Sequence, residues 1–177
     1  MNDGAASTAE PPLVLHAGCG RAPLPEWLSQ YREVRLDVDP SHRPDMLASM
    51  TDLGEIGPFN AVLCCHSLGH LHPDDVDRAL REFHRVLSPG GMAIVIVPDL
   101  EGVRPTEEVL YVSPAGPVTG LDMIYGMRSL SQSHPAMIHR TGFIASTLRA
   151  AMERAGFDVV KCDRGGGYNL VAIGGKV

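Results

Sequence analysis

Short apolar runs bounded by glycine and proline alternate along this chain with one amphipathic stretch. Runs of this kind are typical of buried strands, and they occur at residues 13–15, 33–36, 45–48, 60–65 and 92–97. Residues 73–87 differ, because their apolar positions recur at helical spacing and share one face: Val76, Ala79, Leu80, Phe83, Val86 and Leu87. The pattern predicts a helix over 73–87, ended by the turn 88–91 (SPGG), and therefore a β-α-β unit that closes with the strand 92–97.

The rest of the pattern is less regular. A short helix over 23–31 would bury Trp27 and Leu28. Residues 98–140 are rich in proline and glycine, with one helical stretch near 121–127, so we predict an insertion over one end of the sheet that acts as a lid or faces the acceptor.

After this insertion the helical pattern returns. Thr141 would cap a helix that ends at Gly156 and carries one apolar stripe: Phe143, Leu148, Met152 and Ala155. Strands over 157–162 and 168–173 follow, joined by a turn at 164–167. Strands that alternate with helices predict one α/β domain over residues 1–177, with an open, mostly parallel sheet and helices on both faces.

The composition limits the function. Residues 1–12 are small and polar and are predicted to be flexible; they lack the apolar core of a secretory signal, so we expect a cytoplasmic protein. The longest strongly apolar run, residues 92–97, is far shorter than the roughly 20 residues that a membrane-spanning helix needs. The net charge of −6 is spread along the chain without a dense basic run, which disfavours nucleic acid as a partner. The 4 cysteines are expected to be reduced and packed.

A glycine turn follows the first predicted strand, in the segment His16-Ala17-Gly18-Cys19-Gly20. Such a turn at the carboxyl end of a strand exposes backbone N–H groups where open α/β sheets bind ligands. Pro23 occupies the place of the third glycine of the dinucleotide fingerprint, and no P-loop motif occurs. Asp37 ends the next strand at the spacing of an acid that binds an adenosine ribose, although it also suits a plain turn before Pro40.

Four segments in this order, LVLHAGCG, VRLDVDP, FNAVLCCHSLGHL and REFHRVLSPGGMAIVIVPDL, resemble the class I S-adenosylmethionine (SAM)-dependent methyltransferases, in particular the small bacterial type 11 group. The resemblance implies a Rossmann-like sheet of seven strands with an antiparallel last strand. It implies SAM as the cofactor and S-adenosylhomocysteine (SAH) as the product. It places the cofactor against these residues: His16, Ala17, Gly18, Cys19, Gly20, Asp37, Val38, Ser49, Met50, Cys65 and His66.

The chain departs from the family pattern at three positions. Ser49 replaces an acid near the adenine, Asn60 replaces an aspartate, and Gly69 replaces the glutamate of the common LEH stretch. Loss of a carboxylate at position 69 affects the acceptor side, so it bears on catalysis more than on cofactor binding.

Candidate catalytic residues are few, because methyl transfer depends mainly on holding donor and acceptor in line. His70 and His66 follow the fourth predicted strand and could accept a proton from the acceptor; the alternative is that they cap a helix or lie on the surface. Tyr125, His134 and His139 belong to the insertion and could face the acceptor.

Cys64, Cys65 and His66 also suggest a metal site. Neighbouring residues of a strand point to opposite faces, so the two cysteines would not share one ion, and no metal is predicted. The motifs of nucleic-acid amino- and cytosine-methylating enzymes are absent, which favours a small-molecule, lipid-linked or protein acceptor; we predict a small molecule or an acceptor of lipid or saccharide type.

Two alternatives remain open. One is a catalytically silent module that binds SAM, SAH or a partner. The other is a short reductase, which Pro23 and the absence of a Tyr-x-x-x-Lys motif disfavour. A homodimer would be one way of covering the cofactor site.

Overall fold

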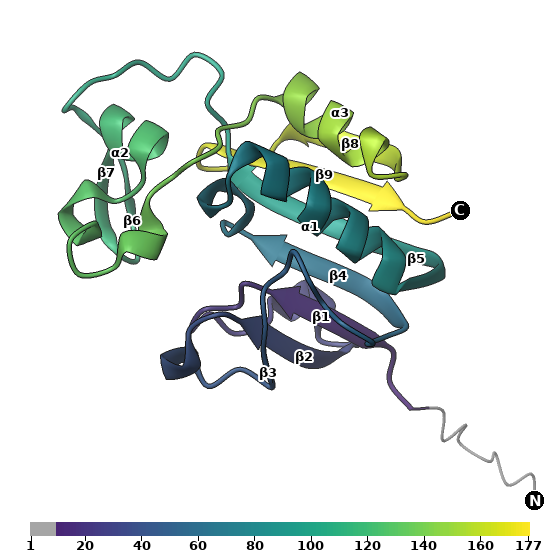
Figure 1. The fold of residues 1–177 in the computed structure, drawn as a ribbon. Helices are drawn as coiled ribbons and strands as arrows, with labels where there is room; N and C mark the ends of the chain where they lie inside the picture. Colours follow the sequence, from purple (N-terminus) through teal and green to yellow (C-terminus); the bar gives the residue numbers. More distant parts are fainter. Residues whose placement is uncertain (1–9) are drawn as a thin grey trace, which may run out of the picture.

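The computed structural model describes residues 10–177 and is built on a seven-stranded sheet in the order β3-β2-β1-β4-β5-β9-β8 (Figure 1). The strands are β1 (Leu13–Ala17), β2 (Arg32–Asp37), β3 (Met46–Leu47), β4 (Phe59–Cys65), β5 (Leu87–Pro98), β8 (Asp158–Arg164) and β9 (Asn169–Gly175). β9 runs antiparallel to both neighbours, and the other pairs are parallel. The predicted Rossmann-like, mostly parallel sheet of seven strands with an antiparallel last strand is confirmed. Of the segment 1–12, residues 1–9 lie outside the described part.

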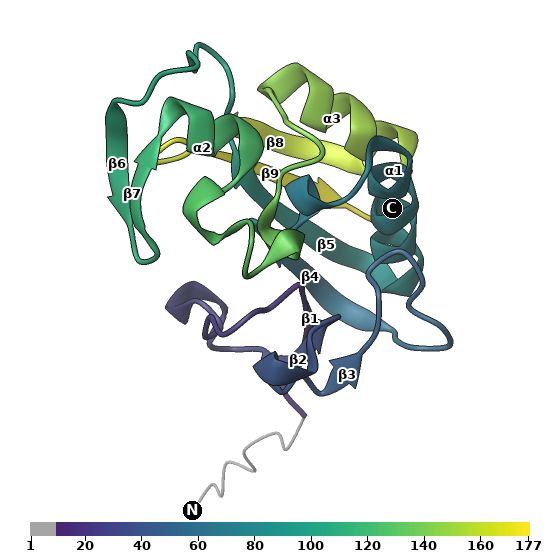
Figure 2. The same cartoon turned by 60° about the vertical axis from the view of Figure 1, so that its left-hand side comes forward.

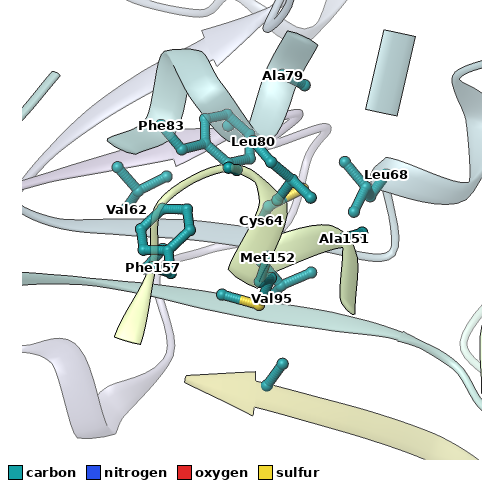
Figure 3. Packing of buried hydrophobic residues seen from close by; sticks show 14 of the residues in the cluster. Val62, Cys64, Leu68, Ala79, Leu80, Phe83, Val95, Ala151, Met152 and Phe157 are labelled. Atoms are coloured by element: carbon teal, nitrogen blue, oxygen red, sulfur yellow. The ribbon is translucent and has the colours of Figure 1, made fainter. Parts of the chain in front are cut away.

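The amphipathic stretch forms α1 (Pro73–Val86), almost as predicted. Pro73 suits the first turn, and Asp74 and Asp75 complement the positive end of the helix dipole. Its apolar stripe packs on one face of the sheet together with α3 (Ala145–Arg154), and Figure 3 shows Leu80 and Phe83 of α1 beside Met152 of α3 in this core.

The predicted cap at Thr141 is wrong. α3 begins at Ala145, where the Ile144 N–H donates to Thr147 Oγ1 at 3.0 Å. The Thr141 hydroxyl instead donates to the carbonyl oxygen of Leu71 at 2.8 Å. A contact with a distant segment therefore replaces the helix cap that the local sequence predicts. The predicted end at Gly156 is confirmed, because Gly156 has φ +101° directly after the helix.

The second face of the sheet is covered by a short segment rather than a long helix. The predicted helix 23–31 is only the 3₁₀ turn η1 (Glu26–Leu28), which follows the imino acid Pro25. Leu28 is buried against Val14 and Leu63, as predicted, but Trp27 is 54% exposed, so its predicted burial is wrong.

The predicted turn 88–91 is part of β5. Leu87 pairs with Phe59 and Met92 with Ala61, so the intervening residues form an irregularity within the strand. Lys176, which follows β9, stabilises this irregularity, because its carbonyl oxygen accepts from the Gly90 N–H and its N–H donates to the Gly91 carbonyl oxygen, both at 2.9 Å. Pairing with a distant segment therefore overrides the local turn signal.

The insertion is more regular than predicted. It contains a hairpin of β6 (Val109–Ser113) and β7 (Gly116–Thr119), the helix α2 (Gly120–Tyr125), and the 3₁₀ turns η4 (Arg128–Leu130) and η5 (Pro135–Met137). It leaves and rejoins the sheet at one place, because the Leu100 N–H donates to the Phe143 carbonyl oxygen at 2.9 Å. Figure 2 shows this lobe beside the carboxyl ends of the central strands. Within residues 10–177, no helix has the length and apolar character to cross a membrane.

Candidate active site

The turns after β1 and β4 meet at a glycine that has no room for a side chain. Gly18 has φ +66°, and a Cβ there would lie 2.4 Å from Ser67 Oγ. Ser67 Oγ donates to the Gly18 carbonyl oxygen at 2.8 Å. Gly20 also has a positive φ, +52°, but no atom lies within 4 Å of where its Cβ would be. Packing therefore requires glycine at position 18, whereas Gly20 borders open space.

Asp37 links this turn to the end of β2. Its Oδ2 accepts from the Gly20 N–H at 2.8 Å and its Oδ1 from the Asp39 N–H at 2.9 Å, while His42 Nδ1 lies 3.2 Å from Oδ1. Burial by itself would raise the pKa of the Asp37 carboxyl, but the two N–H groups and His42 outweigh it, so the pKa lies below its ordinary value. Asp37 is therefore a carboxylate at neutral pH.

Three residues predicted to border the cofactor are buried beneath the turn. Ala17 and Cys19 are 0% and 2% exposed, and burial, as the largest cause, raises the pKa of the Cys19 thiol. His16 Nδ1 lies 2.6 Å from Glu33 Oε1, so this buried ring is already engaged with a carboxylate. The backbone of this segment, rather than these side chains, forms the surface of the turn.

The residues predicted to face the adenine differ in exposure. Val38 follows Asp37 and is 63% exposed, which leaves an apolar surface beside the carboxylate. Ser49 Oγ lies 2.8 Å from Thr51 Oγ1, and Met50 is buried with its Cε 3.1 Å from where a Gly18 Cβ would be. Met50 thus supports the glycine turn from below.

Cys65 is the last residue of β4, and His66 begins the turn that follows it. Burial raises the pKa of the half-buried Cys65 thiol. His66 has φ +56°, an uncommon conformation for a residue with a side chain, and its N–H donates to the Ile96 carbonyl oxygen at 2.8 Å. This strained backbone turns the His66 ring into the cavity described next.

A cavity of about 460 Å³ lies between the carboxyl ends of β4 and β5, the insertion and the β8–β9 turn. Its wall includes apolar residues of the insertion, Val112, Val118, Met123 and Met137, together with Tyr111. Tyr111 stacks on Tyr168 of the β8–β9 turn, with ring centroids 5.6 Å apart. The insertion therefore forms one wall of the cavity and the sheet edge the other.

Three histidines line this cavity: His66, His70 and His139. The rings of His70 and His139 lie 5.0 Å apart between centroids. Desolvation, as the largest cause, lowers the pKa of all three imidazoles; His70 and His139 are half-buried, whereas His66 is exposed to solvent. They are therefore neutral near pH 7 and able to accept a proton.

Tyr125, His134 and His139 were candidates only because they belong to the insertion, and the structure places only one of them at the cavity. His139 lines the cavity, whereas Tyr125 is 56% exposed and His134 is exposed beside Ser133. His139 has no motif signal, because it lies far from His70 in sequence and joins it only through the return of the insertion. Among residues 10–177, no group of three or more His, Cys, Asp and Glu side chains is arranged to hold a metal ion.

The edge formed by β1 and β2 suits a nucleoside cofactor. It offers a carboxylate for ribose hydroxyls, an open surface at Gly20 and exposed apolar surface at Val38. A carboxylate has about four lone-pair sites, and the two backbone bonds to Asp37 leave capacity for a hydroxyl. The residues present fit the predicted cofactor, and their individual roles stay predictions.

Comparisons with solved structures agree with this fold. A methyltransferase from Mesorhizobium loti, described as SAM-dependent, matches with 16% identity and a TM-score of 0.65, covering 93% of this chain and 91% of that one. The 1,6-didemethyltoxoflavin-N1-methyltransferase of Burkholderia thailandensis, solved with 1,6-didemethyltoxoflavin and SAH, matches with 20% identity and a TM-score of 0.62 over 94% of this chain and 72% of that one. Human N-acetylserotonin methyltransferase, solved with SAM, matches with 12% identity and a TM-score of 0.64 over 93% of this chain and 47% of that one.

No curated protein sequence matches the chain significantly. A family model described as a methyltransferase domain, however, matches residues 5–162, which is most of the chain. The chain therefore belongs to the methyltransferase domain family and is a class I SAM-dependent methyltransferase.

Proposed function

We propose that this methyltransferase acts on a small molecule with an apolar body, seated in the cavity between the sheet edge and the insertion. The observation that carries the proposal is the cavity itself. Its volume of about 460 Å³ lies within the range of roughly 300–1,000 Å³ for small-molecule sites.

The cavity wall favours an apolar acceptor over a saccharide. Most of its side chains are apolar or aromatic, and the polar ones are few: the three histidines, Ser113, Asp122 and Asn169. Saccharides need many hydrogen-bond partners, whereas an apolar body needs a few well-placed polar groups. The Burkholderia structure, solved with the small molecule 1,6-didemethyltoxoflavin, supports this choice by analogy of fold.

In this proposal the carboxyl ends of β1 and β2 bind the cofactor, and the cavity beside β4 and β5 binds the acceptor. The Gly18–Gly20 turn and Asp37 hold the cofactor, with Val38, Ser49 and Met50 toward its adenine. Bound SAM supplies an electrophilic methyl group. The chain itself places the acceptor beside it and excludes water, which is the main requirement of an in-line transfer. His66 and His70 face the acceptor and are neutral, so either can take its proton.

Two measurements test the proposal. Calorimetry should show binding of SAH to the purified chain, and a panel of aromatic and aliphatic small molecules should include acceptors that release SAH on incubation with SAM. Failure of SAH to bind to folded protein would overturn it.

SAH binding without turnover of any acceptor would instead support the silent binding module. A homodimer and a cytoplasmic location stay predictions from the sequence.

A further inference from the structure

Position 69 shows how the insertion completes the cavity. Gly69 lies in the 3₁₀ turn η3 (Leu68–His70), and its carbonyl oxygen accepts from the N–H groups of Arg140 and Thr141 at 2.9 and 3.1 Å. A Cβ on Gly69 would lie 3.2 Å from the Thr141 carbonyl oxygen and 3.8 Å from His139 Cδ2. The returning end of the insertion therefore fills the space that a side chain at position 69 would enter, and the imidazole of His139 stands at its border.

Backbone carbonyls set the tautomers of both histidines. His139 Nδ1 lies 3.0 Å from the Met123 carbonyl oxygen, and His70 Nδ1 lies 3.2 Å from the Ile138 carbonyl oxygen. A carbonyl oxygen only accepts, so each Nδ1 carries the hydrogen and each Nε2 keeps a lone pair. Neither Nε2 makes a hydrogen bond within residues 10–177. The pair thus presents two unengaged acceptors at the cavity.

The charges around the pair keep it neutral. Burial is the largest cause that lowers the pKa of His70. The hydrogen bond to the Ile138 carbonyl oxygen raises this pKa, whereas the Arg140 guanidinium, and a proton on His139 or His66, would lower it further. Asp122 also lines the cavity, but its carboxylate is held by Thr119 Oγ1 at 2.6 Å and by Arg128 Nε at 3.1 Å. No lysine or arginine of the described chain lines the cavity, so it offers no cation for an anionic acceptor.

We propose that the cavity selects a neutral aromatic acceptor that bears an O–H or N–H group, and that His139, supplied by the insertion, acts with His70 to receive its hydrogen. His139 thereby places a polar group at the border of the space that a side chain at position 69 would enter. The acceptor's O–H or N–H bond breaks and its electron pair stays on the heteroatom. The proton forms a bond to Nε2 of His139 or His70, which gives an imidazolium and an anionic nucleophile. This inference rests on the proposed function.

The test compares two ligands in which a methyl group replaces the donor hydrogen. Calorimetry without cofactor measures the binding of para-cresol and para-methylanisole to the whole chain, because this phenol stays neutral at pH 7. We expect the phenol to bind about tenfold more tightly, because its hydroxyl can donate a hydrogen bond to an imidazole nitrogen that the anisole leaves unpaired. The preference should fall in His139→Ala and in His70→Ala, and disappear in the double variant.

His134→Ala is the matched control, because His134 belongs to the same insertion but is exposed and bonded to Ser133. It should keep the full preference. Unchanged anisole affinity in the His139 and His70 variants would show that the cavity is intact. The preference should also weaken at acidic pH, where an imidazolium no longer accepts a hydrogen bond.

Equal affinities for the two ligands in the wild-type chain, or an undiminished preference in the double variant, would overturn the inference. Nitrogen NMR of the imidazoles gives a second readout, with His139 and His70 expected as Nδ1–H tautomers at neutral pH. Because neither experiment includes SAM or SAH, failure of cofactor binding remains a separate result that bears on the proposed function alone.

Discussion

The carboxyl ends of the strands form one edge of the sheet, and the cofactor half and the acceptor half of this edge are built in different ways. On the cofactor side, backbone groups of neighbouring strands meet, and Asp37 and Ser67 tie them together. On the acceptor side, the polar groups are the side chains of His66, His70 and His139, and one wall comes from the insertion. The cofactor side should therefore respond strongly to a Cβ added at Gly18, whereas variants of the acceptor side should lose ligand selectivity and keep the fold.

The largest effect is expected for Gly18→Ala. The new Cβ would lie 2.4 Å from Ser67 Oγ at φ +66°, so backbone strain and overpacking should together lower the free energy of unfolding by about 3 kcal/mol. Urea denaturation measures this loss, and SAH binding should vanish with it. Gly20→Ala is the control, because only its φ is unfavourable; it should cost about 1 kcal/mol. Equal losses in the two variants would contradict the close packing at Gly18.

Removal of the insertion should affect ligand binding on the acceptor side much more than cofactor binding. The ends of the insertion are adjacent, since the Leu100 N–H donates to the Phe143 carbonyl oxygen at 2.9 Å. A short glycine-serine linker in place of residues 103–138 should weaken para-cresol binding by about a hundredfold, because the cavity loses one wall. SAH affinity, measured by calorimetry, should fall much less. A larger loss for SAH than for the phenol would instead make the insertion a lid over the cofactor.

Asp37→Asn tests the link between β1 and β2. The amide NH₂ cannot accept, so one of the two N–H groups of Gly20 and Asp39 loses its partner, at a cost of about 2 kcal/mol. SAH affinity should fall by about tenfold as the ribose loses a charged acceptor. Chemical denaturation and calorimetry measure the two effects. His42→Ala leaves both backbone bonds in place and should cost less stability.

The smallest effects should appear in the pH dependence of stability, at a different pH for each half. Burial lowers the pKa of His70 and His139 in the folded chain, so the unfolded chain binds more protons and stability falls as the pH drops below about 6.5. For Asp37, burial is outweighed by the bonds that lower its pKa. Its stabilising contribution is present above its ordinary pKa and is lost as the pH falls through the lower folded value.

Thermal unfolding of wild type and His139→Ala from pH 7 to pH 5 tests the acceptor half. The variant should lose less stability over this range. Asp37→Asn should differ from wild type in slope only in the more acidic range. Identical slopes for wild type and His139→Ala would show that this histidine is not desolvated in the folded chain.

Several features could be predicted from sequence because they depend on neighbours along the chain. The helix α1 follows from its apolar spacing and its acidic first turn, and the strands of the parallel sheet follow from short apolar runs. Gly18, Gly20 and Asp37 were recognisable because a turn and the end of the next strand keep a set spacing in this fold. In the structure the Gly20 N–H donates to Asp37 Oδ2 at 2.8 Å, and the roles of these residues in cofactor binding stay predictions.

Other features depended on contacts between distant segments, which local patterns do not contain. Lys176 turned the segment 88–91 into strand, Thr141 bonded to Leu71 instead of capping α3, and Trp27 stayed exposed because no full helix formed there. His139 is the clearest case at the site. Nothing in its local sequence marks it, and only the docking of residues 140 and 141 on Gly69 brings its ring beside His70.

The sequence by itself therefore determined the methyltransferase fold and the glycine turn with its carboxylate, since short-range spacing encodes both. The tertiary structure alone decided the acceptor cavity, because its wall joins residues whose proximity depends on the path of a long insertion.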